Sequence, residues 1–299
     1  MKTRAQIRLL ADGRRLHLHD GPMDLIVEAF GKPCEVEAGY RAATARFVTV
    51  LDELCGELSY LRRACSPEAK WPHGAVARRM VAAVMPYASE YFITPMAAVA
   101  GAVAEEILAS MVSSAQLSRA YVNDGGDIAI HLQAGEKFVV GMVEQPESPS
   151  LLGTTTMRGQ DSVRGIATSG WRGRSFSLGI ADAVTVLADR AAAADAAATI
   201  LANAVDLRGH PAIVRVPACD LAPDSDLGER RVTQAVGALT LKEVHQALRA
   251  GAETADRLLR MGLIRSAALS LQGETRIVGV LEGARRIATP VREGSLAHA

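Results

Sequence analysis

Short turns built around glycine separate several alternating segments of this chain, and they restrict its possible topologies. Turns of this length join antiparallel neighbours, because a parallel neighbour needs a crossover of a dozen or more residues. The apolar–polar alternation on either side of each turn is typical of strands. We therefore expect mostly antiparallel sheets. The turns are Asp12-Gly13, Asp124-Gly125-Gly126 and Ala134-Gly135-Glu136.

Segments with helical spacing of apolar residues lie between the predicted strands. One begins at Thr94-Pro95, where threonine is a favoured N-cap and proline a favoured first helical residue. Strands and helices are mixed with few βαβ spacings, which indicates an α+β fold with mostly antiparallel sheet. The predicted helices span residues 41–63, 75–85, 95–111, 191–204 and 241–261. Later predicted strands span residues 163–167, 183–188, 212–216, 230–236, 267–271 and 276–280.

The segment Gln145–Gln160 is rich in Pro, Ser, Gly and Thr and is predicted to be a loop. It is the best candidate for a mobile lid or for a subdivision of the chain. No repeat of fixed period is visible. We expect one domain over residues 1–287, followed by a flexible tail over residues 288–299.

Net charge and hydropathy indicate which kinds of molecule the protein can bind. Lys plus Arg equals Asp plus Glu, 33 of each, so nothing in the net charge favours nucleic acid. The longest apolar stretch, Met96–Ala104, is too short to span a bilayer, and we find no secretory signal. We expect a cytoplasmic protein whose partner is a small molecule, with no role for nucleic acid or membrane.

The four cysteines form no CxxC pair and lie far from zinc-ligand spacing with histidine. We expect reduced and mostly buried thiols, as in cytosolic proteins. An alanine-rich chain with few aromatic residues is also compatible with a homodimer.

Three polar segments are candidates for chemistry. Glycines after Asn123 and Asp124 permit positive φ and close approach of a ligand to the backbone, although an ordinary hairpin turn has the same composition. Hydroxyls in Thr168-Ser169-Gly170 can bind a ligand or satisfy their own turn. Asp195 and Thr199 share one face of a predicted helix, and their side-chain oxygens suit Mg²⁺. The alternative is an ordinary helix, with an Asp favoured near its N-terminus and a Thr bonded to its own backbone.

Together and in this order, these segments resemble the ApbE family of flavin transferases. The family has an N-x-G-G-D-I turn, an A-T-S-G segment, an S-V-T-V-I-A strand and an A-D-A-L-A-T helix. The chain is most similar to an ApbE-like branch of unknown function, found in methanogens and one-carbon-metabolising bacteria. That branch shares the P-M-A-A-V-A-G-A and D-L-G-x-R-x-V-T segments. The matching segments are residues 123–128, 167–170, 183–188, 194–199, 95–102 and 226–233.

The resemblance implies an ApbE-like fold, related to the T-fold, and a role in cofactor metabolism. ApbE uses Mg²⁺ and FAD to attach FMN to a Thr or Ser of a target protein. The implied metal ligands are Asp195, Thr199 and the backbone carbonyl near Val99. The ligand implied is flavin-like (FAD or FMN) or pterin-like. The residues implied to line its central cleft are Asn123, Asp124, Gly125, Gly126, Asp127, Thr168, Ser169, Gly170 and Arg172.

The chain departs from the family where the catalytic histidine is expected. The segment Trp171–Asp182 contains no histidine, Ala100 replaces a lysine, and Glu105 replaces an aspartate. These changes argue against the usual FMN transfer. Asp182 is the candidate replacement base, provided that burial raises its pKa. His17 and His19, beside Asp20, are either a metal pair or exposed strand histidines.

Three hypotheses about function stay open at this point. The chain is an enzyme acting on a flavin-like or pterin-like substrate, a non-catalytic small-molecule binding protein, or an assembly protein on the same scaffold. The sequence does not determine whether there is turnover.

Overall fold

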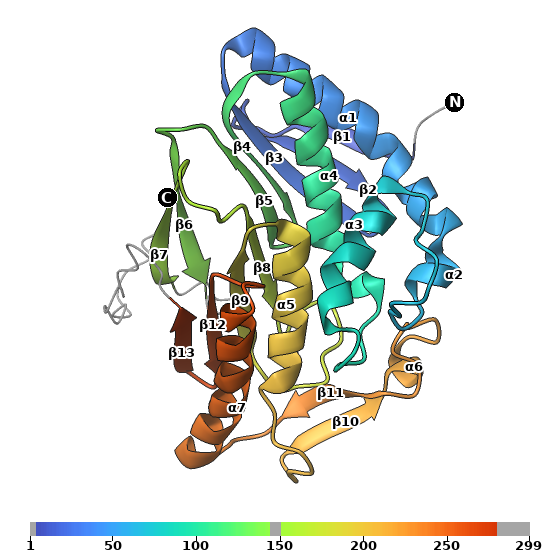
Figure 1. Cartoon of the computed structure of the whole chain (residues 1–299), viewed down its shortest axis with the longest axis vertical. Helices are drawn as coiled ribbons and strands as arrows, with labels where there is room; N and C mark the ends of the chain where they lie inside the picture. The colour runs from blue at the N-terminus through green and yellow to red at the C-terminus, as the bar shows by residue number, and fades with distance from the viewer. Residues whose placement is uncertain (1–3, 144–150, 280–299) are drawn as a thin grey trace, which may run out of the picture.

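A computed structural model describes residues 4–143 and 151–279 of the chain. Within this part, nine strands form one sheet in the order β1-β2-β3-β4-β5-β8-β9-β12-β13, and every neighbouring pair is antiparallel (Figure 1). The fold is therefore α+β, as predicted. The sheet strands are β1 (Gln6–Leu9), β2 (Leu16–Asp20), β3 (Met23–Gly31), β4 (Leu117–Asp124), β5 (Asp127–Leu132), β8 (Gly165–Ser169), β9 (Ala183–Ala188), β12 (Ser266–Leu271) and β13 (Glu274–Gly279).

Two further antiparallel pairs lie outside this sheet. β6 (Lys137–Val143) pairs with β7 (Leu151–Arg158), and β10 (Ile213–Pro217) pairs with β11 (Arg231–Val236). The β10–β11 pair lies beyond the end of α5, at the bottom of Figure 1.

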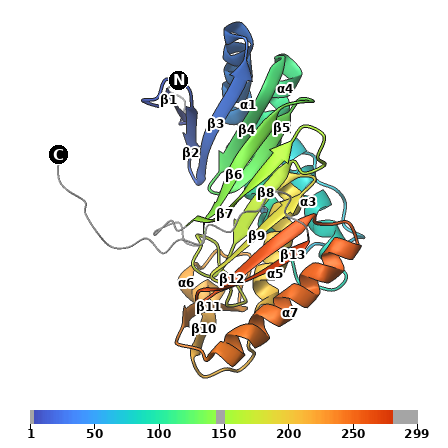
Figure 2. The same cartoon turned by 90° about the vertical axis from the view of Figure 1, so that its left-hand side faces the viewer.

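Helices cover one face of the large sheet. Figure 2 shows the strands in succession, with the long helices on one side of them. From one end to the other, α1 packs on β2 and β3, α4 on β4 and β5, α5 on β8 and β9, and α7 on β12 and β13. The helices are α1 (Pro33–Gly56), α2 (Leu58–Leu61), α3 (Ala75–Val84), α4 (Val99–Ser114), α5 (Ala191–Ala204), α6 (Ala218–Leu221) and α7 (Leu241–Arg260), with single 3-10 turns at η1 (Met85–Tyr87) and η2 (Pro95–Ala98).

Small residues bring α4 and α5 unusually close together. The alanines on the inner side of α5 are fully buried. A Cβ added to Gly101 in α4 would lie 2.4 Å from the carbonyl oxygen of Ala191, so only glycine permits this crossing. A Cβ added to Gly165 in β8 would lie 2.2 Å from the amide nitrogen of the same residue. The start of α5 is thus held between a helix and a strand, beside the predicted site.

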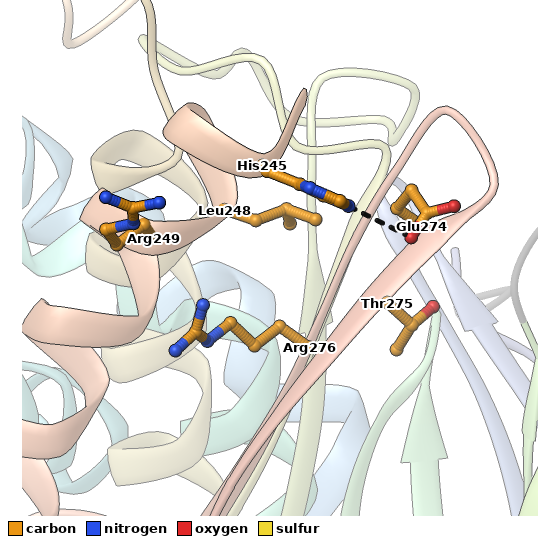
Figure 3. Close-up of a pocket in the computed structure, with 6 residues that line it drawn as sticks. All are labelled: His245, Leu248, Arg249, Glu274, Thr275 and Arg276. Carbon is orange, nitrogen blue, oxygen red and sulfur yellow. Dashed lines mark hydrogen bonds and ion pairs between the residues drawn. The ribbon is translucent and has the colours of Figure 1, made fainter. Parts of the chain in front are cut away.

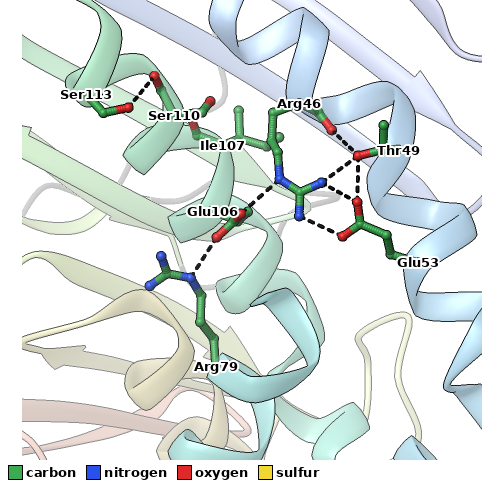
Figure 4. A network of polar contacts seen from close by, with 8 residues as sticks. All are labelled: Arg46, Thr49, Glu53, Arg79, Glu106, Ile107, Ser110 and Ser113. Carbon is green, nitrogen blue, oxygen red and sulfur yellow. Dashed lines mark hydrogen bonds and ion pairs between the residues drawn. The ribbon is translucent and has the colours of Figure 1, made fainter. Parts of the chain in front are cut away.

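A polar network ties the helical layer together (Figure 4). Arg46 of α1 bonds to Glu53 and to Glu106 of α4, and Arg79 of α3 bonds to Glu106 at 3.0 Å. Arg79 also reaches the neighbouring Glu105 at 3.3 Å. Because these side chains are mostly shielded from solvent, they fix the packing of three helices on one another.

Glu105 has a second role in this layer. Its Oε1 accepts a hydrogen bond from the backbone N–H of Ala192 at 2.9 Å. The N-cap of α5, Arg190, provides no side-chain acceptor. Glu105 therefore caps α5 from a neighbouring helix, and its negative charge lies at the positive end of the helix dipole. Glu105, which replaces an aspartate of the ApbE family, thus holds the start of α5.

Several boundaries differ from the sequence predictions. The predicted loop Gln145–Gln160 is wrong over Leu151–Arg158, which forms β7, and residues 144–150 lie outside the described part. The first helix begins at Pro33, where proline occupies the first turn, rather than at residue 41. The predicted tail 288–299 also lies outside the described residues, and the single-domain assignment stays a prediction.

The cysteine prediction is half right. All four cysteines lie in the described part and are unpaired, but Cys34 and Cys55 are exposed and the other two are half-buried. The expectation of mostly buried thiols was therefore wrong.

One helical stretch, Pro95–Ser114, is long and apolar enough to pass a membrane-span test by length and composition. It lies against α1, α3, α5 and two strands of the sheet, as the core helix of a folded domain does.

Candidate functional site

The β4–β5 turn, which the sequence predicts to bind a ligand, borders a cavity of about 370 Å³. Gly125 and Gly126 have φ of 63° and 115°, which most other residues avoid. The Asn123 side-chain oxygen accepts the N–H of Gly126 at 2.8 Å and closes the turn. The cavity lies on the sheet face opposite the helices and is lined by Arg8, Leu10, His17, Asp24, Ile26, Asn123, Gly125 and Gly126.

Three carboxylates gather on the other side of this turn, beneath the helices. Asp124 is 4 % exposed, and its Oδ1 accepts the backbone N–H of Asp24 at 3.4 Å. Asp127 faces Asp124 across the hairpin and accepts the N–H of Thr168 at 3.2 Å. Asp195 of α5 accepts the N–H of Gly101 at 3.0 Å. We call Asp124, Asp127 and Asp195 the acid cluster.

Burial controls the protonation of the acid cluster. It raises the pKa of Asp124 to about 7. Burial also raises the pKa of Asp127, with a further increase from the charge of Asp124. The pKa of Asp195 is raised well above its ordinary value, first by burial and then by the charge of Asp127. Burial therefore favours the neutral, protonated form of these three side chains over the charged form.

Arg174 is the positive charge nearest to this turn. Its guanidinium lies over Gly125, where an added Cβ would be 1.8 Å from Nη2. Its charge lowers the pKa of both Asp124 and Asp127, against the larger effect of burial. The side chain is exposed, and it forms no ion pair with any described carboxylate. Arg174 is thus available to an anionic ligand.

Arg172, the arginine selected from the sequence, is otherwise engaged. Its Nε donates to Asp182 at 2.7 Å, and its guanidinium lies 4.6 Å from the centre of the Trp171 ring. The Arg-Gly-Arg pattern identified both arginines, but only the fold distinguishes the one beside the turn.

Asp182, the predicted base, has both carboxylate oxygens occupied. Oδ1 accepts from Trp171 Nε1 at 3.1 Å as well as from Arg172, and Oδ2 accepts the N–H of Gln272 at 2.6 Å. Gln272 is the only non-glycine residue with positive φ in the described chain, at 45°. The side chain of Asp182 is only 6 % exposed. This arrangement anchors a loop and engages both carboxylate oxygens. A catalytic role for Asp182 stays a prediction.

The segment Trp171–Asp182 is held at several points beyond Asp182. The N–H of Ile180 donates to the carbonyl of Val205 at 2.8 Å, and the carbonyl of Ser177 accepts from Thr233 at 2.8 Å. The second contact comes from the D-L-G-x-R-x-V-T segment. The segment Trp171–Asp182 therefore serves as a brace between α5 and β11.

The A-T-S-G segment meets the acid cluster through its backbone. Besides donating its N–H to Asp127, Thr168 pairs its hydroxyl with that of Thr185 at 2.9 Å. Ser169 is half-buried at the end of β8. Gly170 is required because a Cβ there would lie 2.4 Å from the carbonyl oxygen of Asp182.

The residues implied to hold a metal lie on α4 and α5, which pack against each other. Val99 is the first residue of α4, two residues before the amide that bonds Asp195, and Thr199 follows Asp195 by one turn of α5. In the described part of the chain, no three His, Cys, Asp or Glu side chains are arranged to ligate one ion. A single carboxylate, a hydroxyl and a carbonyl nevertheless fit Mg²⁺, which retains water ligands and prefers oxygen.

His17 forms a contact that the sequence did not predict. It bonds to Asp24 and not to Asp20, whose carboxylate faces the helices and pairs with Arg4. The ring centres of His17 and His19 are 6.3 Å apart. Asp20 therefore lies away from the two histidines, and His17 is not an exposed strand histidine, because only 16 % of its side chain is exposed.

A second cavity, of about 290 Å³, lies between α7 and β13 (Figure 3). His245 pairs with Glu274 at 3.4 Å across its mouth, and Arg276 extends from β13 toward α7. It shares no residue with the predicted site.

The profile of a family described as "AbpE bacteria" matches residues 7–277, which is most of the chain. The chain belongs to this family. Its membership confirms the resemblance to an ApbE-like branch.

Archaeal UPF0280 proteins are similar to the chain. The protein from Methanosarcina acetivorans is 32 % identical over 186 residues, 61 % of this chain and 70 % of the relative. That from Methanopyrus kandleri is 42 % identical over 125 residues, 41 % of this chain and 48 % of the relative. That from Methanococcoides burtonii is 38 % identical over 150 residues, 50 % and 58 % respectively. The chain thus spans about half the length of the latter two relatives.

Solved structures show more distant likeness. The flavinyl transferase ApbE of Pseudomonas stutzeri, in its apo form, superposes with a TM-score of 0.47 at 10 % identity, covering 93 % of this chain and 95 % of that one. A variant of the flavin transferase ApbE of Vibrio cholerae gives a TM-score of 0.38 at 13 % identity, covering 92 % and 96 %.

Proposed function

We propose that this protein binds a flavin, FAD or FMN, at the β4–β5 turn, together with Mg²⁺ at the crossing of α4 and α5. The observation that carries the proposal is the acid cluster, which lies directly behind a glycine turn bordering a cavity. Flavin is the ligand that family membership favours, and Mg²⁺ is the cation that the oxygen donors favour.

The cavity has the properties of a small-molecule site. Its volume of about 370 Å³ lies in the usual range for ligand pockets. Leu10 and Ile26 provide apolar surface for a ring, and Arg8 and Arg174 provide positive charge for phosphate groups. Gly125 and Gly126 allow the ligand to approach the backbone closely.

Asp195, Thr199 and the carbonyl of Val99 would hold the cation. Bound there, Mg²⁺ would supply positive charge to the phosphate oxygens of the ligand and offset the repulsion within the acid cluster. Asp195 must be ionised to act as a ligand, so cation binding competes with its protonation.

Thermal melting with FAD, FMN, ATP or a reduced pterin, each with and without Mg²⁺, tests this proposal. A ligand present at about 100 times its Kd stabilises the native state by about 2.7 kcal/mol. We expect FAD or FMN to raise the Tm by several degrees, more with Mg²⁺ than without.

Asp195→Asn should abolish the Mg²⁺-dependent part of this shift. Asp256→Asn is the matched control, because Asp256 is exposed on α7 and far from the turn in sequence. An unchanged shift in Asp195→Asn would refute the metal site. A shift with the pterin alone would replace flavin by a pterin as the ligand.

A non-catalytic binding protein is the second candidate. It is favoured by the state of Asp182, whose oxygens are all hydrogen-bonded, in a segment without histidine. Flavin binding without any chemical change in the flavin would support it.

A further inference from the structure

The second cavity, between helix α7 and strand β13, is lined by ionisable side chains from both elements (Figure 3). His245 and Arg249 come from α7, where they are one helical turn apart and therefore on one face. Glu274 and Arg276 come from β13, where they are two residues apart and also share a face. The cavity thus brings together two basic residues, one acidic residue and a histidine.

The register of the β12–β13 hairpin turns Arg276 toward α7. Arg276 is directly opposite Leu269 of β12, and opposite residues of an antiparallel pair point to the same face of a sheet. Leu269 faces α7, because a Cβ added to Gly251 of that helix would lie 2.7 Å from its side chain. Figure 3 shows the Arg276 side chain extending from β13 toward α7, which carries Arg249. The two guanidinium groups therefore face the same cavity from opposite elements.

One pair of side chains across this cavity has complementary partners, and the other does not. His245 bonds to Glu274 at 3.4 Å. Arg249 and Arg276 form no ion pair or hydrogen bond with any residue in the ranges 4–143 and 151–279. Even Glu253, one turn further along α7, is not paired with Arg249. Like charges that face each other repel, so an anion between the two guanidinium groups would be stabilising.

We propose that Arg249 and Arg276 bind the phosphate group of a small phosphorylated molecule in this cavity. A guanidinium donates two parallel hydrogen bonds to phosphate oxygens, and a phosphate monoester carries close to two negative charges at pH 7. Its charge therefore matches the two arginines.

The remaining lining and the volume indicate the size of the ligand. Leu248 of α7 provides apolar surface for the organic part of the molecule. The volume of about 290 Å³ is at the lower end of the range for ligand pockets, which favours a ligand of few atoms. This cavity shares no residue with the cavity at the β4–β5 turn, so the proposal does not rest on flavin binding.

Isothermal titration calorimetry of the whole chain with inorganic phosphate and with glycerol 3-phosphate, at low ionic strength, tests this proposal. We expect glycerol 3-phosphate to bind more tightly than inorganic phosphate. Arg249→Gln and Arg276→Gln should each weaken binding of both compounds by about 10-fold or more. Glu274→Gln should tighten binding by about two- to five-fold, because it removes a negative charge from the cavity.

Arg260→Gln is the matched control. Arg260 is exposed at the end of α7 and does not line the cavity, so this variant makes the same change in net charge and should bind within about two-fold of wild type. Thermal melting without phosphate gives a second readout. Arg249→Gln and Arg276→Gln should melt no lower than wild type, since each removes a repulsion.

Several outcomes would overturn the proposal. Equal affinities in wild type, Arg249→Gln and Arg276→Gln would do so, as would undetectable binding of both compounds to wild type. Loss of binding in Arg174→Gln with full binding in Arg276→Gln would place the phosphate at the β4–β5 turn instead. Tighter binding of inorganic phosphate than of glycerol 3-phosphate would rule out a phosphorylated organic molecule as the ligand. A clearly lower Tm of both arginine variants without phosphate would contradict the repulsion on which the argument depends.

Discussion

Asp124 is buried beneath the β4–β5 turn, and the exposed Arg174 is the positive charge that acts on it. Its carboxylate has one backbone donor, from Asp24. Desolvation therefore outweighs the favourable contacts, and the neutral form is favoured up to about neutral pH. The same imbalance affects Asp127 and Asp195.

Stability of the cation-free protein should fall as pH rises. The pKa of Asp124 is about 7 when folded and about 3.9 when unfolded. Between these values the native state binds more protons, so the free energy of unfolding decreases with pH. The contribution is fully present below about pH 4 and is lost as pH rises through about 7.

Asp124→Asn removes this titration and retains a side-chain oxygen for Asp24. We expect the variant to gain about 1–3 kcal/mol relative to wild type between pH 4.5 and pH 8. Urea unfolding in EDTA at both pH values measures it, with Asp256→Asn as control. Parallel pH profiles for wild type and Asp124→Asn would contradict the assigned burial.

Helices α4 and α5 depend on each other at their starts. Gly101 allows the crossing, its amide bonds Asp195, and Glu105 one turn later caps α5. The alanines of α5 then fill the narrow space between α4 and the sheet. Local helix propensity alone would not place these two helices so close. The close contact requires glycine and alanine at the crossing, because larger side chains would keep the two backbones apart.

Gly101→Ala should separate the two helices. The added Cβ would overlap the backbone of Ala191, so we expect a loss of about 1–3 kcal/mol and weaker Mg²⁺ binding at Asp195. Gly56→Ala is the control: Gly56 ends α1 with no atom near its Cβ position, and the change should be neutral or stabilising. Similar stability for both variants, by urea unfolding, would disprove the close crossing.

Glu105 gives a second prediction for these helices. Glu105→Ala leaves the N–H of Ala192 without its acceptor and should cost about 1 kcal/mol. Glu105→Gln retains an acceptor oxygen but not the charge, so its loss should be smaller. If the two variants were equally destabilised in chemical unfolding, the interaction with Arg79 rather than the cap would be the dominant contribution.

Across the whole molecule, one sheet connects segments from both ends of the chain. β1 forms one edge and β13 the other, and α1, α4, α5 and α7 cover the same face. The braces between layers, such as Asp226 to Thr94 and Thr233 to Ser177, join the β10–β11 arm to the helical layer and the site loop. Because of these contacts, the described residues show no boundary at which one part could unfold while the rest stayed folded.

We therefore expect a single cooperative unfolding transition. The chain has two tryptophans, Trp71 before α3 and Trp171 beside the site, which report on different regions. Single-tryptophan variants with the other changed to Phe should show the same midpoint as far-UV circular dichroism. Different midpoints for the two probes would indicate separate domains and contradict the single-domain prediction.

The sequence alone determined the features that depend on residues close together along the chain. Glycine after aspartate set the β4–β5 hairpin, Thr-Pro set the turn that leads into α4, and the alanine run set α5, each through local backbone preference. Motif order was also enough to indicate the family. The strand β7 was missed because the Pro- and Ser-rich residues before it gave the whole segment a loop composition, although the three threonines of β7 favour a strand.

Tertiary structure decided which polar groups meet. Asp24 and Asp124 are 100 residues apart in the chain, Gly101 and Asp195 are 94 apart, and Asp182 and Gln272 are 90 apart. No local pattern encodes these contacts, since each depends on strand register and helix packing. For the same reason only the fold shows that Arg174, and not Arg172, lies at the turn. It also shows that His17 pairs with Asp24 and not with Asp20, because alternate residues of a strand face opposite sides of a sheet.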